Sequence, residues 1–159
     1  MARVTLPEIL NAVTDIFRTT TVLMPGETVA RLFDVQAYDE LTEAIQDIPA
    51  IQVFLDGITV DSNTTTDRHT MRVGTQKSTL SLVVRTFARQ RSNANDDMAA
   101  VLACWDAVEA TLEQVSLDCL PFFGLAAIRS FHWTAAPMLY DYARVLYVGI
   151  EHTLTLEVF

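Results

Sequence analysis

Histidines are the side chains in this chain best suited to acid–base or metal chemistry. His132 and His152 fall in two expected strands, and Glu151 adjoins His152. If those strands are neighbours, the three side chains could form a metal or ligand site. His152, however, interrupts the apolar side of its strand, where a hydrogen-bonded core histidine is the better interpretation. His69 lies far from both in the sequence.

Other catalytic patterns are missing from the sequence. The five glycines are scattered, so there is no glycine-rich phosphate loop, and no serine has a nucleophile-elbow context. Cys104 and Cys119 have neither disulfide-framework nor metal-ligand spacing, and we interpret them as buried thiols of a reducing compartment. The sequence therefore predicts a protein that is not an enzyme and that needs no metal and no cofactor.

Basic side chains gather in one polar stretch, residues 58–77. After 58–60, which continue a strand pattern, DSNTTT at 61–66 is polar and has no core pattern; long segments of this kind are usually functional or disordered. We expect a long hairpin or protruding loop that docks on carboxylates of a partner; DNA phosphates and a dispensable surface loop are the alternatives. The side chains expected to make the contact are Arg68, His69, Arg72 and Lys77.

Charge and length limit the class of protein. Twenty acidic residues against 11 basic ones give a net charge of −9, whereas electrostatic binding to nucleic acid needs a basic surface. The 159 residues, half of them apolar, favour a single domain, 1–159. The start, MARVTLPEIL, lacks a basic region followed by a long apolar run. We therefore expect no signal peptide, no membrane span and an intracellular protein.

The expected fold is organised around an amphipathic helix at 96–115. Its apolar residues recur at steps of three and four, which places them on one stripe, and Leu102 widens that stripe. The stripe consists of Met98, Val101, Trp105, Val108, Leu112 and Val115. Such a helix needs a surface to cover, and strands are expected on both sides of it in the chain.

Alternating apolar residues predict three strands, at 78–89, 125–134 and 145–159. The last strand alternates almost without a break, which is typical of a half-buried antiparallel strand. The outer face of the first strand is mixed in character. Its residues Arg85, Phe87 and Arg89 are candidates for a subunit interface, in which the arginines meet a neighbour's acidic helix; solvated arginines are the alternative.

The N-terminal third is expected to add helices and a hairpin. Thr5 and Glu8 form a capping-box pattern for a helix that ends near Arg18. Asp34 is expected to cap a second helix, 35–46, with an acidic outer face. Asp56-Gly57 predicts a tight hairpin turn between 50–55 and 58–60. Residues 135–144, which contain Pro137, are expected to form an apolar loop.

Together these elements predict an α+β fold: a mostly antiparallel sheet with a long amphipathic helix packed across one face, N-terminal helices and a protruding hairpin or loop. In size, in element order and in the final strand, LYVGIEHTLTLEVF, the chain resembles the tail terminator (tail completion) proteins of long-tailed bacteriophages. The resemblance covers nearly the whole chain and is one of pattern, without a diagnostic motif. The extra helix at 35–46 departs from the smallest members.

The resemblance implies a structural virion protein of the tail and neck, assembled in the host cytoplasm. Copies of the subunit would form a ring, usually a hexamer, that caps the tail tube protein and gives the head completion or connector protein its docking surface. DNA would pass through the channel without specific binding, which suits an acidic subunit. The alternatives are another head–tail connector ring and, from a different class, a small ligand-binding or enzymatic domain.

Overall fold

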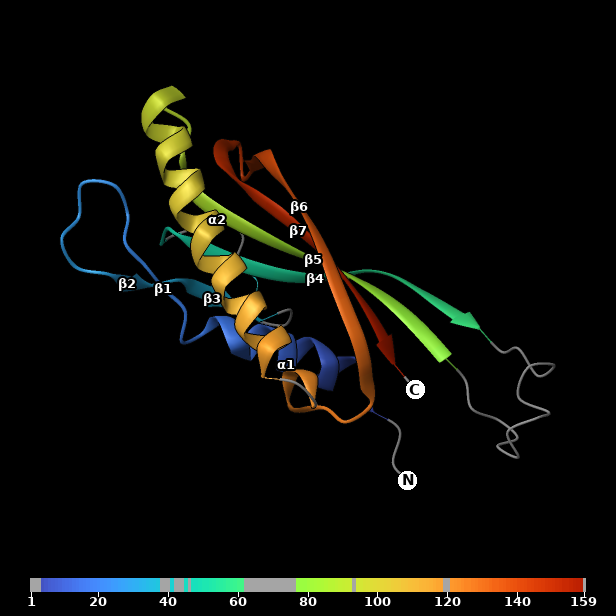
Figure 1. The fold of residues 1–159 in the computed structure, drawn as a ribbon. Coiled ribbons are helices and arrows are strands. Elements are labelled where there is room, and N and C mark those ends of the chain that lie inside the picture. The colour runs from blue at the N-terminus through green and yellow to red at the C-terminus, as the bar shows by residue number, and fades with distance from the viewer. Residues whose placement is uncertain are drawn as a thin grey trace, which may run out of the picture.

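The computed structural model describes residues 4–37, 41, 45, 47–61, 77–92, 94–118 and 121–158. It confirms the α+β class. Five strands form one sheet in the order β3-β4-β5-β7-β6, and all neighbours are antiparallel except the parallel pair β3–β4 (Figure 1). The strands are β3 (Asp34–Gln36), β4 (Ala50–Asp61), β5 (Lys77–Gln90), β6 (Ile128–Tyr142) and β7 (Val145–Val158). A separate antiparallel pair joins β1 (Thr21–Val22) to β2 (Arg31–Leu32).

Helix α1 (Leu6–Phe17) confirms the predicted capping box. The Thr5 hydroxyl accepts from the Glu8 amide, and the Glu8 carboxylate accepts from the Thr5 amide at 2.6 Å. The hydrogen bonds that the Thr5 amide and the Thr5 hydroxyl donate to the Glu8 carboxylate lower the pKa of that carboxyl below its ordinary value. Beyond the end of the helix, the Thr20 and Thr111 hydroxyls lie 2.8 Å apart, which ties α1 to the second helix.

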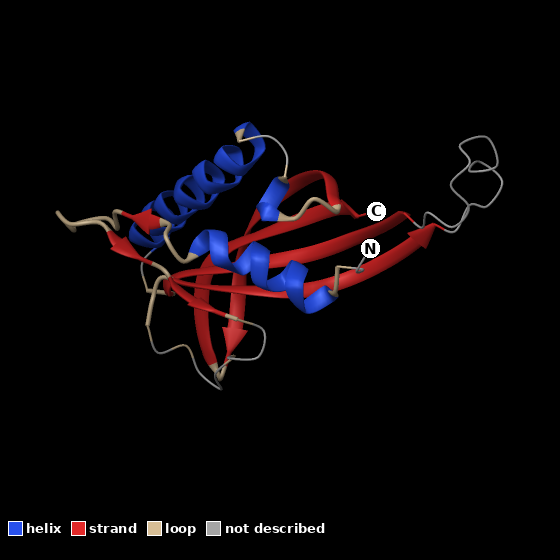
Figure 2. Ribbon diagram, turned by 90° about the horizontal axis from the view of Figure 1, so that it is seen from below, coloured by secondary structure: helices blue, strands red, loops and turns tan. Residues whose placement is uncertain are grey.

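Helix α2 (Ala94–Leu117) covers β5 and β7, with α1 beside it on the same face of the sheet (Figure 2). Its buried stripe includes Val101, Val108 and Leu112, as predicted. The stripe is rotated, however, because Cys104 is buried while Met98 and Leu102 are 51% and 52% exposed. The prediction that Leu102 widens the stripe was therefore wrong. Within the described residues, no helix is long and apolar enough to cross a membrane.

The core lies between the two helices and one face of the sheet. β7 contributes Leu154 and Leu156, which pair across to Leu82 and Leu80 of β5, and all four are buried. The alternation predicted for the last strand thus holds over its central part. A smaller aromatic cluster occupies the opposite face at one end of the sheet, around Phe87.

The second predicted helix, 35–46, was wrong at its start. Asp34–Gln36 form β3, which lies parallel to β4 with Val35 opposite Ile51, and Asp34 therefore does not cap a helix. Most of the remaining stretch, including its acidic face, lies outside the described residues. Val35 is β-branched and buried, which suits a strand. The prediction failed because a strand of three residues is too short for its periodicity to be distinguished from that of a helix.

The Asp56-Gly57 turn was also wrong. β4 runs straight through this dipeptide, and its register with β5 shifts between Leu55 and Gly57. One residue, Asp56, is left over, as in a β-bulge. The Asp56 carboxylate accepts from the Ser81 hydroxyl of β5 at 3.3 Å, so the dipeptide bends the strand instead of reversing it.

Residues 135–144 are strand and turn, so the predicted apolar loop was wrong as well. β6 continues to Tyr142, and a two-residue turn, Ala143-Arg144, connects it to β7. Both turn residues have positive φ, 52° and 66°, as a type I′ hairpin requires. Pro137 is accommodated because β6 is an edge strand, where a missing amide donor is tolerated.

Candidate functional site

The strand pair β4–β5 carries the chain to the end of the sheet opposite the β6–β7 turn (Figure 1). Its last pair is Asp61 with Lys77, so the stretch predicted to dock on a partner leaves and re-enters the fold on adjacent strands. Lys77 opens β5. Arg68, His69 and Arg72 lie outside the described residues. The structure therefore fixes the base of the predicted docking segment.

An apolar row on β4, which the sequence analysis missed, leads toward this segment. Leu55, Ile58 and Val60 are 38%, 43% and 50% exposed and lie on one face of the strand. The bulge at Asp56 explains why the sequence analysis missed the row. It separates Leu55 from Ile58 by three residues, whereas residues on one face of a regular strand are two apart. Exposed apolar residues in a row are typical of a surface that a partner covers.

The same part of β4 is a free sheet edge. β3 pairs with β4 only over Ala50–Gln52, so from Val53 to Asp61 the outer side of β4 has no strand neighbour in the described part of the chain. A free edge offers backbone donors and acceptors to an extended segment of another chain. β4 thus combines an apolar row with an unpaired edge.

Arg85 lies on the face of the sheet that faces away from the helices. Its Nε is 3.6 Å from a Glu151 carboxylate oxygen, and its guanidinium lies over the rings of Phe54 and Tyr140 at 5.1 and 5.7 Å. Burial raises the pKa of the Tyr140 phenol, and the Glu151 charge adds to the shift. Arg85 therefore already has partners within its own chain, although its side chain remains 44% exposed.

The other two interface candidates are held inside the chain. Arg89 forms an ion pair with Asp97 of α2 at 3.2 Å and donates to the Ser92 hydroxyl at 2.7 Å. Phe87 is 1% exposed and packs against Tyr140 and Tyr147. These contacts give both residues a role in holding the fold together; Phe87 has no surface left for a neighbour, whereas the Arg89 side chain remains 34% exposed.

The side chains of the suggested histidine site lie on opposite faces of the sheet. Along β7, His152 points into the helix-covered core, whereas Glu151 is on the other face with Arg85. His132 pairs with Thr155, so it also lies on the face opposite His152 and is exposed. Two side chains on opposite faces cannot ligate one ion. No group of three or more potential metal ligands occurs among the residues that the structure describes.

His152, which is buried, belongs instead to a partly buried polar cluster centred on Glu109 of α2. One Glu109 oxygen lies 3.4 Å from His152 Nε2 and accepts from the Trp105 indole at 3.2 Å. The other accepts from the Trp133 indole of β6 at 2.8 Å. Burial lowers the pKa of His152 below its ordinary value, and the Glu109 carboxylate opposes that shift. Glu109 thereby links α2 to β6 and β7.

Stability should depend on pH through His152. Its pKa is near 6.5 when unfolded and lower when folded, so the unfolded chain takes up the proton first as the pH falls. The stabilisation is complete above pH ~6.5 and declines below it, by at most ~1.4 kcal/mol per pH unit for one group. Urea unfolding at intervals from pH 7.5 to 5.5 would measure this slope.

The matched variants are His152→Gln and His132→Gln. The first should flatten the slope between pH 7 and 5.5, whatever it does to the absolute free energy of unfolding. The second removes an exposed histidine and should leave the slope as it is. An unchanged slope in His152→Gln would assign the pH dependence to other groups.

Two shallow hollows lie along α2. The larger, about 490 Å³, is lined mainly by threonines and alanines between α2 and the segment that follows α1. The smaller, about 280 Å³, lies beside the N-terminal half of α2 and includes Arg91, Met98 and Met138. Cys104 of α2 is buried against Met24, and burial raises the pKa of its thiol to about 12, so it is not a reactive thiolate.

Comparison with known proteins does not place the chain in a family. No protein-family model matches it, and no curated protein matches it. The fold and the surfaces described above are therefore the basis for an inference about function.

Proposed function

We propose that this chain is a structural subunit of the virion of a long-tailed bacteriophage, a tail terminator whose ring ends tail-tube polymerisation and meets the head connector. The observation that carries the proposal is the β4–β5 arm. It has an apolar row, Leu55, Ile58 and Val60, and a free edge beside them, and it leads into a basic segment. Such an element would let a ring subunit contact the next ring of the tail.

Three further features support this function. The α+β fold, with two helices on one face of an antiparallel-dominated sheet, agrees with the fold that the resemblance implies. The net charge of −9 suits a ring through which DNA must slide without binding. The long histidine- and carboxylate-bearing strand β7 uses its polar groups for internal contacts, which suits a structural role.

Docking through the arm can be tested by replacing residues 63–76 with a short Gly/Ser turn in the virus. The last β4–β5 pair, Asp61 with Lys77, lies outside the replaced stretch, so the domain should fold and keep its helical circular dichroism. We expect full heads together with tails of faulty length or tails that do not join, seen by electron microscopy, and a loss of infectious particles.

Two controls sharpen this test. Arg68→Ser with Arg72→Ser keeps the length of the segment and removes two charges; a partial defect would show that the charges contribute to docking. Three scattered Gly/Ser changes within residues 62–66 keep all the basic residues and should be tolerated. Normal infectious particles from the full replacement would contradict a docking role for the segment. A defect confined to head filling would favour a connector ring over a terminator.

A further inference from the structure

One end of the molecule carries apolar side chains and arginines together. The hairpin-end patch consists of Arg91, Met98, Met138, Arg144 and Leu146. Met98, Met138 and Leu146 are 51%, 40% and 41% exposed. Arg91, Met98 and Met138 line one hollow of about 280 Å³, and the Arg91 amide donates to the Leu146 carbonyl at 3.0 Å. Arg144 lies in the β6–β7 turn, two residues before Leu146 in the chain.

The two arginines of this patch are available for an external partner. Neither guanidinium has an ion-pair partner among the described residues. Asp97, which lines the same hollow, is already bound by Arg89 and by the Ser92 amide and hydroxyl. An apolar surface with two arginines that form no ion pair among the described residues fits an apolar surface that carries carboxylates.

Such a surface exists on the same chain, along the outside of α2. The α2 stripe consists of Leu102, Asp106, Ala110, Glu113 and Leu117. All five are exposed, and their spacing of three and four puts them on one side of the helix. Leu102 and Leu117 are 52% and 75% exposed. Helix α2 contains no lysine or arginine, so the stripe is apolar and acidic only.

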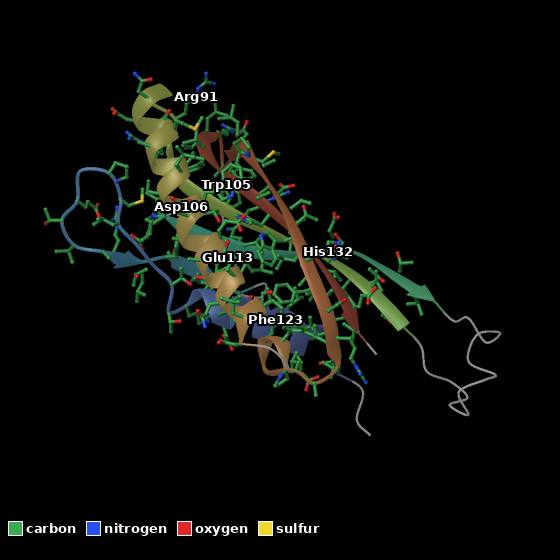
Figure 3. The ribbon with its side chains drawn as sticks, in the orientation of Figure 1. Arg91, Trp105, Asp106, Glu113, Phe123 and His132 are labelled. Carbon is green, nitrogen blue, oxygen red and sulfur yellow. The ribbon has the colours of Figure 1, made fainter. Side chains whose placement is uncertain are left out.

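The arginines of the patch and the carboxylates of the stripe do not pair within one molecule, although Met98 adjoins Leu102 on α2. Arg91 lies near the N-terminal end of α2, and Asp106 and Glu113 lie further along the helix (Figure 3). Asp106 is twelve residues from Ala94, or about 18 Å at 1.5 Å per residue, and Glu113 is further still. The partner surfaces must therefore come from two molecules.

We propose that the hairpin-end patch of one copy docks on the α2 stripe of the next copy. Arg91 and Arg144 would meet Asp106 and Glu113, while Met98, Met138 and Leu146 cover the exposed leucines. The two surfaces differ, so the contact is heterologous and can repeat around a ring until it closes. This inference rests on the proposed ring function, and it replaces Arg85 and Arg89, which have internal partners, as the interface arginines.

Charge reversal tests the contact in the purified full-length protein by sedimentation velocity. We expect the wild type to form a closed oligomer. Arg91→Glu with Arg144→Glu should weaken association at least ~10-fold, and so should Asp106→Arg with Glu113→Arg, because each variant places like charges opposite one another. Mixing the two variants restores opposite charges at every contact. The mixture should recover wild-type association to within about threefold.

Arg129→Glu is the control for charge reversal elsewhere on the surface: it makes one of the same Arg→Glu changes, on β6 at the end away from the turn, and it should leave association unchanged. Circular dichroism would verify that each variant is folded. A monomeric wild type, an oligomer that survives both reversals, or a mixture that fails to associate would each overturn the proposed contact. The proposed function has a separate readout, since a virus whose tails are of normal length without this protein would overturn it whichever surfaces the copies use.

Discussion

Gly149→Ala is expected to lower the free energy of unfolding by ~3–5 kcal/mol, near the upper limit for a single substitution. A Cβ at this position would lie 1.8 Å from the backbone oxygen of Thr86 and 3.1 Å from the Tyr140 ring. The Thr86 oxygen belongs to the neighbouring strand β5 and cannot rotate away, as a flexible side chain could. The substitution must therefore push β5 and β7 apart. This would disturb both the core on one face of these strands and the aromatic cluster around Phe87 on the other.

Glycine is required at position 149 because a Cβ would collide with the neighbouring strand, and not because of its backbone conformation. Gly149 is not among the residues with positive φ, whereas Gly26 and Gly124 are. Gly57 is the matched control, because it is also a strand glycine without positive φ and nothing lies within 4 Å of its added Cβ. Gly57→Ala should change the stability by less than ~1 kcal/mol. Chemical denaturation of both variants measures the difference; equal stabilities would mean that β5 and β7 are further apart at this point.

Signals that are local in the sequence predicted local structure well. Thr5 and Glu8 satisfy each other within four residues, so the start of α1 could be found without knowing its neighbours. The long periods of α2 and β7 were equally informative, because repetition over many residues distinguishes a helix from a strand. The predicted stripe of α2 was wrong at its edge, because Met98 is exposed and Cys104 is buried, and the position of the sheet decides which of them faces the core.

The errors occurred where a distant strand decides the structure. Asp56-Gly57 has the composition of a turn, but β5 pairs with β4 on both sides of it and turns it into a bulge. Pro137 suggested a loop, yet the edge position of β6 tolerates it, and Ala143-Arg144 lacks the glycine or asparagine that usually marks a type I′ turn. The order of the strands depends on the whole sheet, so it cannot be predicted from any short stretch of the sequence.

The candidate surfaces illustrate the same limit. Arg85 and Arg89 were placed correctly on one strand, but their partners Glu151 and Asp97 come from β7 and α2. Those pairings depend on register, and the shift between Phe87 and Arg89 could not be read from alternation. Arg91 and Arg144 lie 53 residues apart, by the difference of their sequence numbers, and the pairing of β5 with β7 brings them to one end of the sheet.

Phe87→Ala is expected to cost ~3–5 kcal/mol of stability within a single copy. The side chain is 1% exposed, and its ring centroid lies 4.9, 5.8 and 5.7 Å from those of Tyr140, Tyr142 and Tyr147. Removing it leaves a cavity between these rings and takes away the tilted and edge-on aromatic contacts, which contribute beyond their buried area. Chemical denaturation would measure the loss.

Protein concentration separates this core role from the interface role that the sequence suggested. Stability that comes from subunit contacts grows with concentration, whereas stability within one copy does not. The loss in Phe87→Ala should therefore be the same at two concentrations that differ 100-fold, a range chosen because mass action then changes a binding contribution by about 2.7 kcal/mol. Phe54 is the matched aromatic control on the same face: it is half-buried under Arg85, and Phe54→Ala should cost less than ~2 kcal/mol. A Phe87→Ala loss that appears only at the higher concentration would return Phe87 to the subunit interface and would mean that the aromatic cluster closes against a neighbouring copy.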